Sequence, residues 1–474
     1  DVSAREEVPM KRPAIMTAAI VAFALPILLA GELKCEAPAG RPNIVFILVD
    51  DMGWADPTCY GNRDYETPNV DRLARDGMRF TDAYAACPVC SPTRASILSG
   101  KYPATLNLTD WLPGMHPTDR KLIGPEFIRQ LPLTEFTVAE ALRRAGYATG
   151  SVGKWHLGGE GFLPEDQGFD VNIAGTAAGS PAGGYYLPNK MNLPSAEPGE
   201  YLTDRLSIEA CQFIRANKHR PFFLYLAHHS VHTPIQGRPD LVEKYRAKFA
   251  AAAVNKNAVN KNAAYAAMMQ SADESVGRVL DTLDEAGIAQ QTIVFFMSDN
   301  GGLSGVTSNA PLREGKGHVY EGGIREPMIV RWPGVVRRGT TCSVPVSSVD
   351  FYPTILAMAG VDPDPKQALD GESIVPLLKQ TGRMQRDAIF WHYPHYSPQR
   401  GVPAGAVRRG DYKLIELYED GRLELYNLAQ DIGEQNNLAE KMPQKTAELH
   451  RLLVEWREAV AARMPQKNPK QGQQ

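Results

Sequence analysis

The sequence predicts an α/β fold, in which a large, mixed but mostly parallel sheet is sandwiched by helices and a small antiparallel α+β subdomain follows at the C-terminal end. Two observations predict this architecture. Continuous apolar runs with the character of fully buried strands alternate with helix-like stretches, as in parallel sheets that are covered on both faces. Near Arg383 the pattern changes to short strand-like runs joined by an Asp-Gly turn, which is typical of an antiparallel hairpin.

The chain has 474 residues, which is long enough for two unequal domains. We expect a main domain over 40–385, a C-terminal subdomain over 386–464 and a polar, disordered tail over 465–474. The segment 253–262 repeats Ala-Val-Asn-Lys-Asn twice and predicts a solvated surface insertion.

The N-terminal region has the pattern of an export signal. Met10-Lys11-Arg12 precede an uncharged run from Ala14 to Gly31, and a small-residue stretch follows. We therefore predict a signal peptide over 10–39 and an exported protein, either periplasmic or extracellular. An uncleaved membrane anchor is the alternative, and it would be the protein's one contact with a membrane.

Polar side chains follow three of the predicted strands, which cover 43–49, 221–227 and 292–298. Helix-like stretches over 137–145 and 268–286 lie between these strands in the sequence. Ligands bind beyond the carboxyl ends of the strands in such sheets, so residues far apart in sequence should meet there. We expect five side chains to converge at this edge: Asp50, Asp51, His232, Asp299 and Asn300.

The C-terminal subdomain is predicted from a hairpin and a helix. Runs over 412–418 and 423–426 flank the turn at Asp420-Gly421, and a helix is expected over about 444–462.

Composition excludes one class of partner. The chain carries 51 basic and 54 acidic residues without a long run of either sign, so we expect no nucleic-acid partner. Six cysteines in this length do not indicate a disulfide-dense scaffold.

The acidic residues at the predicted edge indicate a metal site. Three carboxylates crowded together would repel one another strongly without a cation. A ligand set of oxygen atoms favours calcium or magnesium over zinc. We expect one hard cation, calcium or magnesium, held by Asp50, Asp51, Asp299 and Asn300.

The second candidate motif is the segment 87–96, with the sequence CPVCSPTRAS. As Cys-x-x-Cys it could be a redox pair, but no thioredoxin-sized βαβ context surrounds it. A zinc site would need a second Cys or His pair at suitable spacing. From Cys90 to Arg94 the segment resembles the Cys-x-Pro-x-Arg signal that sulfatases present for oxidation of the cysteine to formylglycine.

From Pro42 to about Leu438 the chain resembles a sulfatase of the alkaline phosphatase-like superfamily. Further motifs agree in the family's order: Gly153-Lys154-Trp155-His156-Leu157-Gly158, His232-Thr233-Pro234, and Leu312-Arg313-Glu314-Gly315-Lys316-Gly317 with Glu321-Gly322-Gly323. The resemblance makes 40–385 a sulfatase catalytic domain and implies a formylglycine-generating maturation enzyme as a partner.

The resemblance also implies that the bound cation is one Ca²⁺, with Mg²⁺ as the alternative, and it implies a role for each motif residue. Cys90 becomes the formylglycine nucleophile and a fifth metal ligand, and Arg94 holds it in place. Lys154 and Lys316 bind sulfate oxygens. His232 protonates the leaving alcohol, and His156 takes a proton from the formylglycine so that sulfate is released.

Three other functions remain open on the sequence. One is a phosphomonoester, phosphodiester or phosphonate hydrolase of the same superfamily, the second is an inactive protein that binds sulfated glycans, and the third is a thiol oxidoreductase. The substrate is expected to be a sulfated small molecule or glycan. Export and the Gly- and Tyr-rich segments 179–186 and 391–396, which could line a sugar-sized cleft, favour a sulfated carbohydrate.

Overall fold

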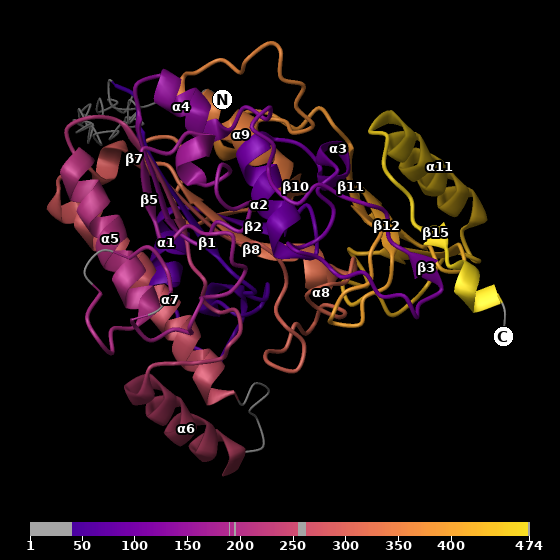
Figure 1. Cartoon of the computed structure of the whole chain (residues 1–474), viewed down its shortest axis with the longest axis horizontal. Coiled ribbons are helices and arrows are strands. Elements are labelled where there is room, and N and C mark those ends of the chain that lie inside the picture. Colours follow the sequence, from indigo (N-terminus) through magenta and orange to yellow (C-terminus); the bar gives the residue numbers. More distant parts are fainter. Residues whose placement is uncertain (1–39, 189, 194–195, 255–261, 473–474) are drawn as a thin grey trace, which may run out of the picture. The chain divides into compact units, whose positions relative to one another are not determined.

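The computed structural model describes residues 40–188, 190–193, 196–254 and 262–472 (Figure 1). The predicted signal peptide over 10–39 and most of the tandem repeat lie outside this part of the chain. Within it, no helix combines the length and the apolar character needed to cross a membrane.

The core is one nine-stranded sheet in the order β10-β2-β8-β7-β1-β6-β4-β5, with β9 paired to β2. The central strand β1 is parallel to both of its neighbours, β6 and β7. Beyond β6 the sheet stays parallel, whereas β8 is antiparallel to β7 and to β2. The strands are β1 (Asn43–Val49), β2 (Met78–Tyr84), β4 (Ala148–Gly153), β5 (Val171–Ile173), β6 (Phe222–Ala227), β7 (Thr292–Ser298), β8 (Arg325–Arg331), β9 (Thr340–Cys342) and β10 (Val346–Ser347).

Two layers of helices cover the sheet because alternate side chains of each strand point to opposite faces. In β1, Val45, Ile47 and Val49 belong to one buried cluster, and the residues between them belong to the other. One face is covered by α1 (Pro68–Asp76), α5 (Leu202–Asn217) and α7 (Ala263–Glu285), and α6 (Pro239–Val254) packs against α7. The other is covered by α2 (Cys90–Ser99), α4 (Val138–Arg144), α9 (Phe351–Ala359) and α10 (Val375–Leu378). The predicted mixed, mostly parallel sheet between helices is confirmed.

Several short helices and turns lie outside the two helix layers. These are α3 (Pro103–Leu106), α8 (Glu321–Ile324) and four 3₁₀ turns, η1 (Thr58–Tyr60), η2 (Pro164–Gln167), η3 (Ala289–Gln291) and η4 (Ser348–Asp350).

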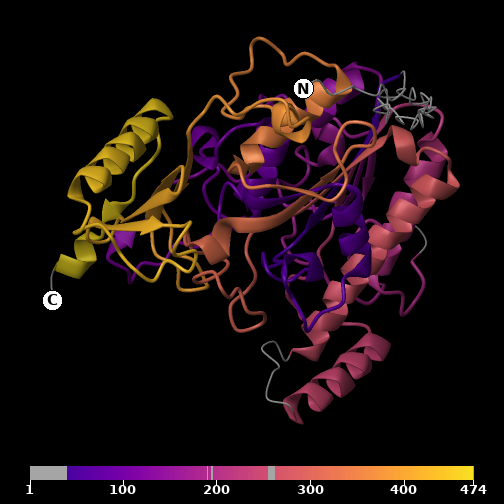
Figure 2. The same cartoon turned by 180° about the vertical axis from the view of Figure 1, so that it is seen from behind.

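The predicted antiparallel part is also present. A four-stranded sheet consists of β11 (Ala388–Tyr393), β12 (Ala404–Arg409), β13 (Tyr412–Leu417) and β14 (Arg422–Asn427). The helix α11 (Pro443–Ala459) lies beside this sheet (Figure 2), and its Leu449 and Leu453 pack against Val407, Leu414 and Leu425. Both sheets belong to one compact unit, and the domain boundary at 385 stays a prediction.

Part of the predicted tail over 465–474 has regular structure among the described residues. The strand β15 (Gln466–Lys467) pairs with β3 (Leu122–Ile123), and the turn η5 (Pro469–Gly472) follows. Between them, the buried Asn468 donates hydrogen bonds of 3.0 and 2.7 Å to the carbonyls of Thr118 and Arg120. A single buried amide therefore anchors a segment whose composition is typical of disorder.

Candidate active site

Polar residues follow four parallel strands and lie at the same edge of the sheet. Asp50 and Asp51 follow β1, Asp299 and Asn300 follow β7, His232 lies shortly after β6, and Lys154 and His156 follow β4. All but His232 are at most 2% exposed. The structure thus brings together the residues that the sequence placed at strand ends.

Each carboxylate of the cluster lies against a buried cation. Lys154 Nζ lies 2.6 Å from Asp50 Oδ2, and Lys316 Nζ lies 2.6 Å from Asp51 Oδ1. Arg94 Nε donates a 2.9 Å hydrogen bond to Asp299 Oδ2. Burial raises the pKa of Asp51, but Lys316 and then His232 more than offset this, so the pKa lies below its ordinary value. Asp51 is therefore ionised.

The acidic cluster has the features of a cation site. Asp50 Oδ1 and Asn300 Oδ1 are buried and accept no hydrogen bond from any described residue. Burial and then the charge of Asp299 raise the pKa of Asp50 well above its ordinary value. One ligand atom each from Asp50, Cys90 and Asp299 lie within 4.8 Å of one another. Buried acceptors without donors are the groups that a hard cation satisfies, so these residues fit a calcium or magnesium ion.

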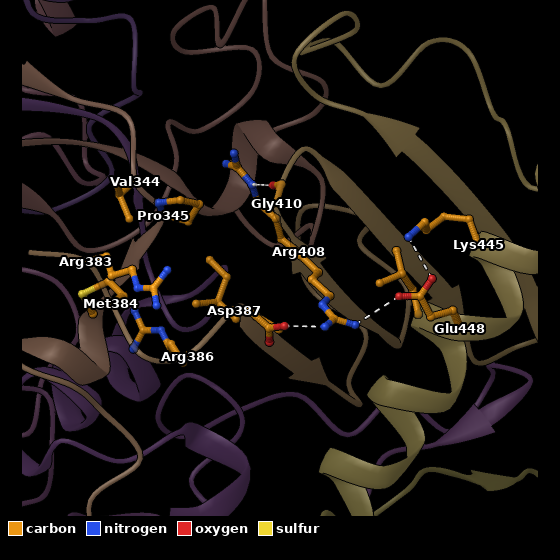
Figure 3. A pocket seen from close by; sticks show the side chains of 14 residues that line it. Val344, Pro345, Arg383, Met384, Arg386, Asp387, Arg408, Gly410, Lys445 and Glu448 are labelled. Atoms are coloured by element: carbon orange, nitrogen blue, oxygen red, sulfur yellow. Dashed lines mark hydrogen bonds and ion pairs between the residues drawn. The ribbon is translucent and has the colours of Figure 1, made fainter.

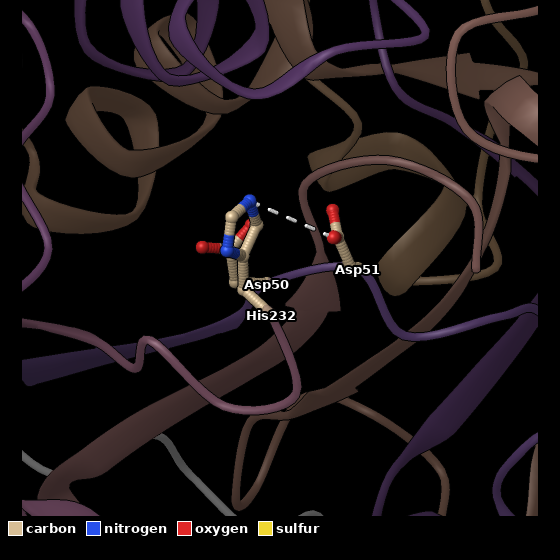
Figure 4. A group of neighbouring side chains, drawn as sticks. All are labelled: Asp50, Asp51 and His232. Carbon is tan, nitrogen blue, oxygen red and sulfur yellow. Dashed lines mark ion pairs between the residues drawn. The ribbon is translucent and has the colours of Figure 1, made fainter. Parts of the chain in front are cut away.

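His232 borders this cluster, with Nε2 lying 3.8 Å from Asp51 Oδ2 (Figure 4). Its Nδ1 lies 2.8 Å from the carbonyl oxygen of Thr233. A carbonyl can only accept, so Nδ1 carries the hydrogen and Nε2 faces the site.

Cys90 is the first residue of α2, and Arg94 follows one turn later on the same helix face. Pro92 is tolerated because it falls in the first turn, where a missing N–H costs nothing. Arg94 is fully buried and also donates to the backbone carbonyl of Lys154 at 3.0 Å. The spacing therefore fixes the start of α2 against β4 and β7, with Cys90 facing the acidic cluster.

The thiol pair does not resemble a redox centre. Cys87 and Cys90 are both free thiols. Burial raises the pKa of Cys87 well above its ordinary value, whereas reactive dithiols have lowered values.

His156 faces Cys90 with a defined tautomer. Nε2 lies 2.6 Å from the carbonyl oxygen of Leu112, so it is the protonated nitrogen, and Nδ1 lies 3.4 Å from Cys90 Sγ. Burial, and then the charge of Lys154, lower the pKa of His156 well below its ordinary value. The ring is therefore neutral, and its unprotonated nitrogen points at residue 90.

A cavity of about 380 Å³ opens onto these groups. Cys90, His156, His232 and Lys316 line it together with residues from other parts of the chain, among them Trp111, Gly179 and Gln399. The cavity has the size of a small-molecule site.

The sequence matches the models of two protein families. Residues 42–361 match the model of the sulfatase family, and residues 315–459 match the C-terminal model of N-sulphoglucosamine sulphohydrolase. The chain belongs to the sulfatase family. It is a sulfuric ester hydrolase, and the buried Asp and Cys cluster is consistent with the metal site that sulfatases use.

Three relatives share most of this sulfatase's length. It is 34% identical to a sulfatase of Formosa agariphila, over 91% of each chain. It is 35% identical to human arylsulfatase A, over 80% of this chain and 75% of that protein. It is 34% identical to human N-acetylgalactosamine-6-sulfatase, over 78% of this chain and 71% of that protein.

Solved structures show the same fold. The crystal structure of Ps i-CgsB in complex with k-i-k-neocarrahexaose is 30% identical to this sulfatase, with a TM-score of 0.75 over 88% of this chain and 92% of that one. The phosphonate monoester hydrolase of Agrobacterium radiobacter is 20% identical, with a TM-score of 0.64 over 89% and 96% of the two chains. These likenesses confirm the alkaline phosphatase-like fold.

Sequence reasoning missed part of the sulfatase's cavity. Trp111 and Gln399 lie in loops without a motif, and only the fold brings them to the cavity. Of the two segments expected to line a cleft, Gly179 does so, but no residue of 391–396 lines this cavity. Trp391 and Tyr393 are instead buried within the C-terminal sheet.

Proposed function

We propose that this sulfatase removes sulfate from a carbohydrate, with a formylglycine formed from Cys90 as its nucleophile and one Ca²⁺ in the acidic cluster. The position of Cys90 carries the proposal. Its side chain lines the cavity and lies between the unprotonated nitrogen of His156 and the cluster of Asp50 and Asp299.

The calcium ion would be held by Asp50, Asp51, Asp299 and Asn300, together with the oxygen of the oxidised residue 90. When bound, it would supply Lewis-acid polarisation of the sulfate group and favour the anionic form of the nucleophile. Asp50 Oδ1 and Asn300 Oδ1 support this assignment because they are buried acceptors without a donor among the described residues.

Side chains of the protein itself carry out the other steps of the reaction. Lys154 and Lys316 are fixed by ion pairs to Asp50 and Asp51, so their charges can face sulfate oxygens without reorganising. Water hydrates the aldehyde of residue 90 to a geminal diol. One diol oxygen bonds to sulfur as the S–O bond to the alcohol breaks, and His232 gives a proton to the leaving alcohol oxygen. His156 then takes a proton at Nδ1 from the second hydroxyl, the C–O bond to sulfate breaks and the aldehyde is restored, so the oxygen that leaves with sulfate comes from water.

Maturation has to precede folding. Cys90 is 3% exposed and Arg94 is fully buried within α2. A maturation enzyme that reads Cys-x-Pro-x-Arg can reach these side chains only while the segment is extended. The predicted signal peptide over 10–39 supports an exported protein, periplasmic or extracellular, on which this enzyme acts before or during export.

The names of relatives support a carbohydrate substrate. One relative is an N-acetylgalactosamine-6-sulfatase, and one structural neighbour was solved with k-i-k-neocarrahexaose. The cavity of about 380 Å³ has the indole of Trp111 on its wall, which offers an apolar face for a sugar ring.

Turnover of a panel of sulfated mono- and disaccharides tests this proposal, with an aryl sulfate, a phosphate monoester and a phosphonate monoester alongside. We expect the highest kcat/KM on one of the sulfated sugars. A higher kcat/KM on a phosphate or phosphonate ester would overturn the proposal in favour of the related hydrolases. Binding of a sulfated sugar without turnover by fully matured protein would indicate a glycan-binding protein.

A further inference from the structure

A second cavity, of about 620 Å³, lies at the side of the C-terminal sheet (Figure 3). Its walls come from the loop before β10, the start of β11, the end of β12 and the first turns of α11. It shares no lining residue with the active-site cavity.

Cationic side chains predominate on its walls. The lining residues include five cations and two carboxylates: Arg383, Arg386, Arg408, Arg409 and Lys445, and Asp387 and Glu448. Two of these cations are neutralised by buried carboxylates from outside the cavity. Arg386 pairs with Asp350, and Arg408 Nη1 lies 2.7 Å from Asp82 Oδ1.

The remaining three cations lie at the rim, where charge compensation is incomplete. Arg409 pairs with Asp387 and Glu448, and Lys445 shares Glu448 at 2.8 Å. The side chains of Arg409 and Lys445 are 42% and 33% exposed, and ion pairs as exposed as these contribute little to stability. Arg383 is exposed and forms no ion pair or hydrogen bond with any residue of the described chain. An anionic ligand can therefore engage Arg383 directly and exchange with the rim carboxylates at little cost.

The floor of the cavity is apolar. Met384, Ala388, Ile389 and Leu449 are all buried and line it. No aromatic side chain is among the described lining residues, so the cavity has no platform for stacked nucleobases. Apolar contact surface beneath fixed cations suits a ligand that has both apolar faces and several anionic substituents, as a sulfated saccharide has.

We propose that this cavity binds an anionic segment of a sulfated glycan away from the ester that is hydrolysed. The class of glycan rests on the proposed function, whereas the cationic rim and apolar floor do not. The site would hold a polymeric substrate on the enzyme, and it would have no part in the chemistry.

Titration calorimetry of the full chain tests the proposal, in a Cys90→Ala background that cannot turn over ligand. The probes are a sulfated galactan hexasaccharide, its desulfated counterpart and inorganic sulfate. We expect two hexasaccharide sites per chain, with Arg383→Glu weakening one of them by roughly tenfold, since one charge-assisted contact contributes about that factor. The control Arg451→Glu lies on α11 outside the cavity, with a side chain 75% exposed, and should leave both sites unchanged.

Equal binding by the Arg383→Glu and Arg451→Glu proteins would overturn the proposal. Desulfated hexasaccharide or inorganic sulfate binding the second site as tightly as the sulfated hexasaccharide would overturn it too. In the Cys90-containing protein, Arg383→Glu should leave turnover of a small aryl sulfate unchanged. Failure of the proposed function would instead appear as no turnover of any sulfated sugar by the parent protein, whatever binds at the second site, so the two failures are distinguishable.

Discussion

His232 is the residue whose role depends most on the state of its ring. Burial, and then the charge of Lys316, lower the pKa of His232 to about 3, and its single hydrogen lies on Nδ1 toward Thr233. The ring is therefore neutral before substrate binds. A proton on Nε2 requires the negative charge of the sulfate ester, which raises the pKa of a neighbouring imidazole.

This geometry makes the effect of His232→Ala depend on the leaving group. A sugar hydroxyl is a poor leaving group and needs a proton, whereas a nitrophenol departs readily as the anion. We expect His232→Ala to lower kcat/KM by about 10²–10⁴-fold on a sulfated sugar, and by much less on a nitrophenyl sulfate.

Lys316→Ala is the matched control, because it acts on sulfate oxygens that both substrates share. It should lower kcat/KM by similar factors on each. Equal losses on the two substrates for His232→Ala would make that residue a sulfate-binding group instead of a proton donor.

Calcium should bind the cluster and stabilise the folded protein. Chelation is expected to lower the Tm of the wild type and added calcium to restore it, because a ligand of the native state stabilises it by mass action. Asp299→Ala should remove this calcium response and nearly all turnover while far-ultraviolet circular dichroism stays native. Stoichiometric zinc in the purified protein, with calcium unable to replace it, would contradict the assignment.

At the scale of elements, the loop that orients His156 is held by the C-terminal sheet. Asp110 accepts hydrogen bonds from the backbone N–H of Trp111 at 2.9 Å and from the hydroxyl of Tyr393 at 3.0 Å. Leu112, which follows Trp111 in the chain, supplies the carbonyl oxygen that fixes the tautomer of His156. Tyr393, on β11, thus reaches the active site through one loop.

Tyr393→Phe removes one hydrogen bond of this loop and should lower kcat by roughly fivefold to tenfold, with KM little changed. Tyr396→Phe is the control, since its hydroxyl bonds instead to Glu419. Steady-state kinetics on one sulfated sugar measure both. A loss of the same size in the Tyr396→Phe protein would show that the effect is general loosening of the C-terminal sheet.

A buried ion network joins the same sheet to the segment after Lys316. Lys413 Nζ on β13 lies 2.9 Å from carboxylate oxygens of both Glu321, at the start of α8, and Glu434. All three side chains are 0% exposed. Removing the shared cation would leave the buried Glu434 without an ion-pair partner and would leave Glu321 with Arg325 alone.

Lys413→Met should therefore lower the free energy of unfolding by about 3–5 kcal/mol, measured by denaturant titration. The comparison is Arg215→Met, which breaks a pair whose side chains are 54% and 66% exposed and should change stability by less than about 1 kcal/mol. Equal, small changes in the two variants would mean that the buried network adds nothing to stability.

At the scale of the whole molecule, the sequence predicted those parts of the fold that rest on local pattern. The runs at 43–49 and 292–298 are fully buried strands, and their polar ends predicted the edge where Asp50 and Asp299 meet. The hairpin at Asp420-Gly421 formed as expected because turn chemistry is also local.

What the sequence did not predict depends on long-range contacts. Trp111 and Gln399 enter the active-site cavity because the C-terminal sheet packs beside the main sheet, and neither residue carries a motif. The tail at 466–467 is ordered by pairing with β3, more than 340 positions earlier. Composition and periodicity carry no information about either contact.

Peptide mass spectrometry of residues 80–94 tests the central claim most directly. The protein is made with and without a formylglycine-generating enzyme, and the fraction of residue 90 present as the aldehyde is compared with turnover of a sulfated sugar. The account predicts that turnover rises in proportion to the aldehyde and that Cys87→Ser leaves this relation unchanged. Full turnover by protein whose Cys90 is entirely the unmodified thiol would contradict it.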